Sequence, residues 1–365
     1  MGISQIRWRI GLQANSLPFK FDLVFPLSAM ARHCNTRPVG CYCIEYCVFA
    51  VRLEVEIQPV AWAKLPMGLS LTDSGYTETP EVAESTPPPL LTETSRLPGF
   101  PTQAERADRF QLYERAVQCP EAEVDFLDTT FWRLRHRLPR VLREDFCGAG
   151  ALCCEWVRRR VVNRALGVDI DGEVLAWGRQ HHLAGMEPAL AQRVQLLQQD
   201  VLEVESAPAD IICALNFSYW LLVGRARLKQ YFIRVLHALA EGGVFFLDAY
   251  GGYDSFREIV EEREFDTFGY VWEQEKFDPI SGRLICHIHF RFPDGSRLER
   301  AFSYDWRLWI LPEIRELLAE AGFDNITVYW QGWDRQGQPN GAFLPVTEGK
   351  ADAGWICYLT AEKPF

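Results

Sequence analysis

Acidic residues and glycines with an informative spacing occur in the stretch "VLREDFCGAGALCCEWV" (141–157). A strand-like run leads into the acidic pair Glu144 and Asp145, and Gly148 and Gly150 follow before a helical pattern begins. Glycines at such a turn let the backbone approach a ligand closely, and the following helix presents free N–H groups. Alone, this acid-x-x-x-G-x-G pattern fits either a ligand-binding loop or a tight turn without a ligand.

Two further carboxylates follow later strand-like runs. Asp169 ends "ALGVD" about 19 residues after Gly150, a spacing at which a carboxylate can accept both hydroxyls of a ribose. Asp200 follows "QLLQQ" and could accept a hydrogen bond from an adenine amino group, although a solvated loop aspartate is the alternative. Asp171 is predicted to be the N-cap of the next helix.

Polar and aromatic residues follow the next two strand-like runs. In "ADIICALNFSYWLL", Asn216 and Phe217 would face the reacting end of a ligand, and Asp248 and Tyr250 end "EGGVFFLDAY". These positions are informative because ligands of open α/β sheets bind outside the carboxyl ends of the strands.

Strands and helices alternate from residue 104 onward. Residues 105–137 have a mostly helical pattern, and a helix and two strands close the chain. Five earlier strands are expected at 140–146, 164–169, 193–199, 209–215 and 243–249. The sequence therefore predicts an α/β fold, with a doubly wound, mostly parallel, seven-stranded sheet in the domain 104–365.

An antiparallel insertion is expected at 253–308, where it would cap the cleft and select the substrate. Three alternating strands are separated by "DPISG" and "PDGS", and Asp294-Gly295 is a strong hairpin signal. In the middle strand, His287 and His289 share one face, opposite an apolar face. The pair suggests a general base or a metal pair, with a solvated polar face as the alternative. We expect no metal, since no third ligand is evident nearby.

Taken together, these strand ends resemble those of the class I S-adenosylmethionine-dependent methyltransferases. The resemblance covers about residues 105–365 and extends to a subgroup with the motifs "LREDFCG", "NFSYW" and "DWRLW". It implies that Asp169 holds the ribose, and that Asp200 with the backbone of Val201 holds the adenine of S-adenosylmethionine. It also implies that Asn216 and Phe217 lie near the methyl group. The loop under the methionine part would be formed by Glu144, Asp145, Phe146, Cys147, Gly148 and Gly150.

One position departs from the methyltransferase pattern. Phe146 replaces the first glycine of the D-x-G-x-G-x-G loop, which leaves open whether Glu144 or Asp145 is the acidic residue. The rival cofactor is NAD, used by oxidoreductases. Its G-x-G-x-x-G fingerprint needs a third glycine, and Cys153 stands there.

Methyl transfer from a sulfonium mainly requires alignment in a dry site, and a base is needed only for a protonated nucleophile. We expect an unidentified small-molecule acceptor, with His287, His289 and Tyr304 as candidate bases and Asn216 as an orienting group. The alternatives are a non-catalytic sensor or scaffold that binds S-adenosylmethionine, and a protein-interaction module built around an acidic linker. Neither the acceptor nor the oligomeric state follows from the sequence.

Bulk properties narrow the choice of partners. The net charge of −11 argues against nucleic acid, and no apolar run is long enough to span a membrane. With no signal-peptide pattern, we expect a cytoplasmic protein. Residues 1–75 are expected to be unstructured or mis-annotated, with Met67 as the true start, and 76–103 to be a disordered linker. Cys41, Cys43 and Cys47 are expected to be free thiols rather than a metal site.

Overall fold

The computed structural model describes residues 100–335 and 339–364. The predictions for residues 1–75, for Met67 and for Cys41, Cys43 and Cys47 lie outside the described residues, as does most of the expected linker. Of that linker only residues 100–103 are described, and its last residue, Gln103, begins α1 (Gln103–Arg106). The Thr102 side chain caps this helix, and the Glu105 carboxylate accepts a hydrogen bond from the Thr102 N–H.

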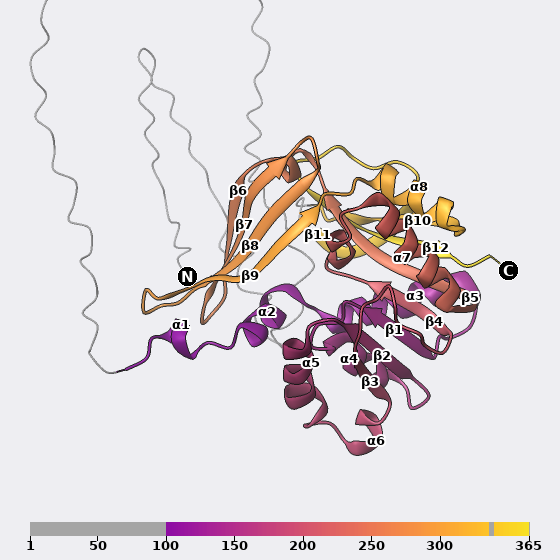
Figure 1. The fold of residues 1–365 in the computed structure, drawn as a ribbon, viewed down its shortest axis with the longest axis horizontal. Coiled ribbons are helices and arrows are strands. Elements are labelled where there is room, and N and C mark those ends of the chain that lie inside the picture. Colours follow the sequence, from indigo (N-terminus) through magenta and orange to yellow (C-terminus); the bar gives the residue numbers. More distant parts are fainter. Residues whose placement is uncertain (1–99, 336–338, 365) are drawn as a thin grey trace, which may run out of the picture. The chain divides into compact units, whose positions relative to one another are not determined.

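The main sheet has eight strands in the order β11-β10-β12-β5-β4-β1-β2-β3 (Figure 1). The strands from β1 to β5 are mutually parallel, whereas β12, β10 and β11 are antiparallel additions. The strands are β1 (Val141–Asp145), β2 (Arg164–Asp169), β3 (Val194–Gln198), β4 (Ala209–Ala214), β5 (Leu239–Gly251), β10 (Asp324–Trp333), β11 (Pro339–Val346) and β12 (Trp355–Glu362).

The predicted α/β sheet is confirmed, but seven strands is one too few. The missed strand is β11, whose sequence "PNGAFLPV" contains two prolines and a glycine. Proline is depleted in strands because it cannot donate to the ladder, yet an edge strand tolerates it. Because β11 pairs only with β10 and ends the strand order, it is such an edge strand.

Helices cover both faces of the main sheet. The apolar residues of α3, α4 and α5 pack on one face, and those of α7 and α8 on the other. The remaining helical segments are short or precede the sheet. In chain order the helices are α2 (Arg109–Val117), α3 (Pro120–Arg135), α4 (Ala151–Arg159), α5 (Gly172–Gly178), η2 (Arg179–Leu183), α6 (Pro188–Ala191), η3 (Ser218–Leu221), α7 (Arg225–Ala238), η4 (Tyr253–Phe256) and α8 (Leu311–Ala321).

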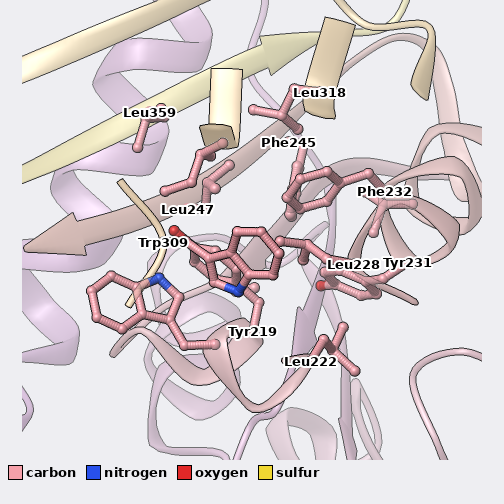
Figure 2. Packing of buried hydrophobic residues seen from close by; sticks show 14 of the residues in the cluster. Tyr219, Leu222, Leu228, Tyr231, Phe232, Phe245, Leu247, Trp309, Leu318 and Leu359 are labelled. Atoms are coloured by element: carbon pink, nitrogen blue, oxygen red, sulfur yellow. The ribbon is translucent and has the colours of Figure 1, made fainter. Parts of the chain in front are cut away.

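The face under α7 and α8 holds a densely aromatic core. Figure 2 shows Tyr219, Phe232, Phe245 and Trp309 among leucines from the helices and from β5 and β12. Phe245 stacks on Phe323 with ring centroids 5.9 Å apart. Large aromatic side chains bury 150–250 Å² each, so this core fixes the strand ends that it supports.

A second sheet has four antiparallel strands in the order β6-β7-β8-β9. The strands are β6 (Ile259–Glu264), β7 (Gly269–Asp278), β8 (Arg283–Arg291) and β9 (Arg297–Arg307). The three predicted strands are β7, β8 and β9, and β6 was missed. Gly295, with φ 78°, forms the predicted β8–β9 turn. As predicted, Leu284, Cys286, Ile288 and Phe290 share the buried face of β8.

Helix α2 links the second sheet to the helices of the main sheet. Its Phe110 ring lies 6.1 Å from Phe302 of β9 and 5.8 Å from Trp177 of α5, measured between centroids. Glu114 of α2 bonds His182 of η2 at 2.6 Å. Figure 1 shows α2 running between the second sheet and α5. No helix in the described part of the chain is long and apolar enough to cross a membrane.

Candidate active site

The loop between β1 and α4 adopts a left-handed backbone at three positions. Phe146, Gly148 and Gly150 have φ angles of 59°, 53° and 75°. Gly150 is favoured by its left-handed φ, and a Cβ there would also lie 2.7 Å from the Leu196 Cδ2 atom, so that side chain would have to move. At Gly148 a Cβ would meet only Val174, at 4.0 Å, so the space beside this backbone is open. The loop therefore keeps a cradle shape although Phe146 replaces a glycine.

The acidic pair before this loop divides between the two faces of the sheet. Asp145 is fully buried and pairs with the Arg143 guanidinium at 2.7 Å, and the Tyr231 hydroxyl donates to it at 2.9 Å. Glu144 points the other way and accepts a hydrogen bond from the Cys153 thiol at 3.2 Å. Burial raises the pKa of Glu144 to about 8. Asp145 is thus committed to an internal ion pair and Glu144 to the Cys153 thiol, and the cofactor role expected for one of them stays a prediction.

Cys147 lies under the loop rather than beside the open space. Its side chain is buried, and a Cβ at Gly167 would lie 2.8 Å from the Cys147 Sγ atom. Burial also raises the pKa of this thiol well above its usual value. The structure thus gives Cys147 a packing role between β1 and β2, which the sequence pattern did not reveal.

Asp169 is fixed at the end of β2 beside the glycine loop. One carboxylate oxygen accepts the Gly148 N–H at 2.8 Å, and the other accepts the Asp171 N–H at 2.9 Å. Asp171 in turn caps α5 through the Glu173 N–H, as predicted. The half-buried Asp169 carboxylate has a pKa raised by burial. A carboxylate oxygen has two lone pairs, so each oxygen can accept a second hydrogen bond from a ligand.

The same edge of the sheet continues at the turn after β3. One Asp200 oxygen accepts the Leu202 N–H at 2.9 Å, and the other lies 3.4 Å from the Arg227 guanidinium. Val201 is buried in the core under α7. The Asp200 carboxyl is half-buried, so a ligand can reach it, and its predicted adenine contact stays a prediction.

The turn after β4 is held by a single buried carboxylate. Asn216 and Phe217 have φ angles of 58° and 56°, which few non-glycine residues adopt. Their N–H groups donate to the two oxygens of Asp248 at 2.8 and 2.9 Å. The Tyr219 hydroxyl donates to the Asp248 carbonyl at 2.8 Å. Burial raises the pKa of Asp248 to about 7, although these N–H groups act in the opposite direction.

A cavity opens at this turn, between the main sheet and the second sheet. It contains about 690 Å³ of space without protein atoms, its open mouth included. Seven of its 18 lining residues are aromatic, and the lining comes from α2, β5, η4, the four strands of the second sheet, the turn after β4 and the segment before β12. The residues used below are Tyr113, Asn216, Phe217, Tyr250, Asp254, Glu261, Tyr270, Trp272, Gln274, Ile288, Tyr304 and Trp306.

Of the three predicted bases, only Tyr304 lines the cavity. His287 and His289 alternate with Cys286 and Ile288 along β8, so they lie on the face of the second sheet opposite the cavity. There His287 bonds Glu275 and Ser303, and His289 bonds Glu273 and Glu299. Tyr304 does line the cavity, but burial raises its pKa well above its usual value. Both histidine predictions are therefore withdrawn, and Tyr304 is left as a hydrogen-bond donor rather than a base.

Several residues of the site were missed from the sequence. Tyr113 comes from a helix before the sheet, and Glu261 comes from the unrecognised strand β6. Gly178 of α5 is a third example, since a Cβ there would lie 2.0 Å from the Ala149 carbonyl oxygen. Only the alternation of "IVEERE" could have indicated Glu261, and that segment is too short and too charged to stand out.

Neither a protein-family model nor a curated protein matches the sequence. Solved structures do match. A methyltransferase dependent on S-adenosylmethionine from Clostridium acetobutylicum is 18% identical, with a TM-score of 0.52, and the match covers 70% of this chain and 98% of that one. This chain has a methyltransferase fold. CalS10, an amino pentose methyltransferase from Micromonospora echinaspora, is 16% identical with a TM-score of 0.51, covering 71% and 98%.

A third match has the same character. The CcbJ methyltransferase from Streptomyces caelestis is 15% identical with a TM-score of 0.50, and the match covers 67% of this chain and 90% of that one. At these identities the likeness concerns the fold. The methyltransferase fold places the loop after β1 and the ends of β2, β3 and β4 along one edge, which is where the residues described above lie.

Proposed function

We propose that this protein transfers a methyl group from S-adenosylmethionine to a small-molecule acceptor. One observation carries the proposal: the glycine loop, the Asp169 carboxylate and the turn after β4 lie at one edge of the parallel strands. The hydrogen bond from Gly148 to Asp169 joins the first two directly. Asn216 and Phe217 of the third line an aromatic cavity.

The residues present fit the cofactor. The open space at Gly148 would admit the methionine part, and the free lone pairs of Asp169 suit a ribose diol. Asp200 stands where an adenine amino group would be recognised, with the Val201 backbone next to it. CalS10, which shares the fold, was solved with S-adenosylmethionine bound.

When bound, S-adenosylmethionine would supply an activated methyl carbon whose bond to sulfur breaks as the acceptor bonds to it, with the electron pair staying on sulfur. The protein's own task is alignment and exclusion of water. Asp248 fixes the turn that carries Asn216 and Phe217, so this rim of the cavity is rigid. We further propose that the second sheet is the substrate cap expected from the sequence, because Trp272, Tyr304 and Trp306 line the cavity from it.

The three motifs of the resemblance also contribute to this region, which supports placing the chain in that subgroup. "LREDFCG" forms β1 and its loop, and "NFSYW" forms the turn held by Asp248. "DWRLW" places Trp306 in the cavity wall and Arg307 over the Trp309 ring, 3.7 Å from its centroid.

Calorimetry with S-adenosylhomocysteine tests the proposal. We expect the full chain to bind this ligand, and Asp169→Ala to weaken binding by roughly a hundredfold, because two charge-assisted hydrogen bonds are lost. Asp305→Ala is the matched control, since Asp305 is an exposed carboxylate of β9 that pairs with Arg283 of β8. Unchanged affinity in Asp169→Ala would refute the ribose role. Binding of NAD instead of S-adenosylhomocysteine would refute the proposal itself.

A further inference from the structure

The charged residues that line the cavity beside the turn after β4, called here the acceptor cavity, are all acidic. Asp254 and Glu261 both line it, and none of the lining residues that the structure describes is Lys, Arg or His. A phosphate or carboxylate acceptor would find no counter-ion there and would meet two carboxylates. A cationic group would find the opposite, so the cavity favours a cation.

The two carboxylates differ in whether they already form an ion pair within the protein. Asp254 forms an ion pair with Arg257 at 2.6 Å, and its backbone carbonyl accepts a hydrogen bond from Gln274 at 3.0 Å. Within the described residues no side chain or backbone group forms a hydrogen bond or ion pair with the Glu261 carboxylate. Glu261 is therefore the carboxylate that can serve a ligand.

Aromatic rings stand next to Glu261. In the β6–β7 pairing Glu261 lies directly opposite Trp272, which in turn lies opposite Ile288 of β8. The Trp272 ring centroid lies 6.0 Å from that of Trp306 and 6.3 Å from that of Tyr304. Tyr304 and Trp306 stack at 4.4 Å, and Phe217 completes the wall 6.3 Å from Trp306. Such aromatic faces attract ammonium groups.

We propose that the methyl acceptor is a primary or secondary amine, bound as its ammonium ion by Glu261 against the ring of Trp272. The inference rests on the proposed methyl transfer and narrows its substrate class. It also assigns the base that the two histidines of β8 do not provide.

The proton balance of the reaction follows from this arrangement. The Glu261 carboxylate accepts one proton from the ammonium, which frees the nitrogen lone pair to form the new N–C bond. The proton then leaves Glu261 for water at the mouth of the cavity. The methylated nitrogen carries the positive charge that sulfur gives up, so no further reactant is needed.

The surroundings of Glu261 suit this task. Burial, and then the nearby charge of Asp254, raise the pKa of Glu261 to about 7. A base is most effective when its pKa lies near the working pH. Besides Asp254, the titratable groups that line the cavity are tyrosines of α2, β5, β7 and β9: Tyr113, Tyr250, Tyr270 and Tyr304. The nearest cation on β6 is Arg263, two residues further along, which lies over the Tyr270 ring, 5.2 Å from its centroid.

Equilibrium binding of matched probes tests the inference without relying on turnover. The full chain, saturated with S-adenosylhomocysteine, is titrated with 2-phenylethylamine and with its neutral analogue 2-phenylethanol, and likewise with glucosamine and glucose. We expect at least one amine to bind more tightly than its neutral partner. Glu261→Gln should weaken that binding by about tenfold to a hundredfold, the usual effect of losing a hydrogen-bonded charge.

The neighbouring glutamate provides the control. Glu262 points to the opposite face of β6, where it pairs with Arg291 at 2.8 Å, so Glu262→Gln should leave amine binding unchanged. Both variants should bind S-adenosylhomocysteine like the parent chain, which shows that they fold. In turnover with the amine, Glu261→Gln should also remove the acid limb near pH 7 from the profile of kcat/KM.

Different outcomes overturn different statements. Neutral partners that bind as well as the amines, the absence of binding by either amine, or unchanged amine binding in Glu261→Gln would each overturn the amine assignment. In all three cases the proposed methyl transfer stands as long as S-adenosylhomocysteine binds and Asp169→Ala weakens that binding by roughly a hundredfold. Loss of S-adenosylhomocysteine binding in the parent chain would instead overturn the proposed function.

Discussion

Glu123 gives the sharpest prediction about stability. This residue of α3 is buried, and its pKa is raised from 4.5 to about 8, first by burial and then by the nearby charge of Glu144. Replacement by glutamine keeps the size of the side chain and removes the titrating proton. We predict that Glu123→Gln stabilises the protein at alkaline pH and leaves its stability nearly unchanged at acidic pH.

The sign follows from proton binding. Folded Glu123 holds its proton more tightly than the unfolded chain does, so the folded state carries more protons between pH 4.5 and about 8. The free energy of unfolding therefore falls as the pH rises through this window. One pKa unit corresponds to about 1.4 kcal/mol, which sets a ceiling of roughly 5 kcal/mol on what Glu123→Gln can recover at pH 8.

Urea unfolding at pH 5 and pH 8 measures the effect, with the fluorescence of the 12 tryptophans as the signal. We expect the gain from Glu123→Gln to be several kcal/mol at pH 8 and close to zero at pH 5. Glu121→Gln is the control, because Glu121 is exposed on the first turn of the same helix. Its effect should stay within about 0.5 kcal/mol at both values. Equal effects of Glu123→Gln at the two pH values would refute the reasoning.

Two further predictions concern the cofactor loop and the thiols. Gly178→Ala would force a Cβ against the Ala149 carbonyl, so we expect a loss of about 1–3 kcal/mol in urea unfolding and weaker binding of S-adenosylhomocysteine. Gly185→Ala, where nothing lies within 4 Å, should change neither, and equal behaviour of the two variants would contradict the packing argument. Burial raises the pKa of Cys147, Cys153 and Cys213, so their peptides should resist iodoacetamide in the folded protein and react in urea. Rapid alkylation without urea, read by mass spectrometry, would contradict their burial.

The parts of the fold that the sequence predicted well depend on local signals. Four of the five parallel strands lie within the predicted segments and β5 extends beyond its segment at both ends, because each combines a short, largely apolar run with a polar or glycine-rich end. The Asp171 cap and the turn at Gly295 depend on one or two residues and are confirmed. The strands β6 and β11 were missed because their sequences are not typical of strands. Charged residues dominate β6 and prolines interrupt β11, so only their pairing with neighbouring strands identifies them.

The histidines of β8 show why the candidate base could not be found in the same way. Alternation correctly separated His287 and His289 from the apolar face, but it does not say which face looks into a cavity. The apolar face of the second sheet packs toward the main sheet, so any polar residue that reaches a ligand must interrupt that face. Glu261 does so, and only the pairing of β6 with β7 brings it opposite Trp272.

The left-handed backbone of the site could not be predicted from the sequence, because it also occurs at residues other than glycine. Phe146, Asn216 and Phe217 adopt left-handed conformations that predict glycine, and each costs about 1–2 kcal/mol. Such residues persist only where the surroundings over-determine them. The backbone of Asn216 and Phe217 is held in this conformation by Asp248 of β5, whose carboxylate accepts hydrogen bonds from both N–H groups. A buried charge is itself unfavourable, so the chain carries two unfavourable features that stabilise each other at the turn after β4, which lines the acceptor cavity. Because one carboxylate holds both N–H groups, the Asn216–Phe217 backbone is fixed where it lines the cavity.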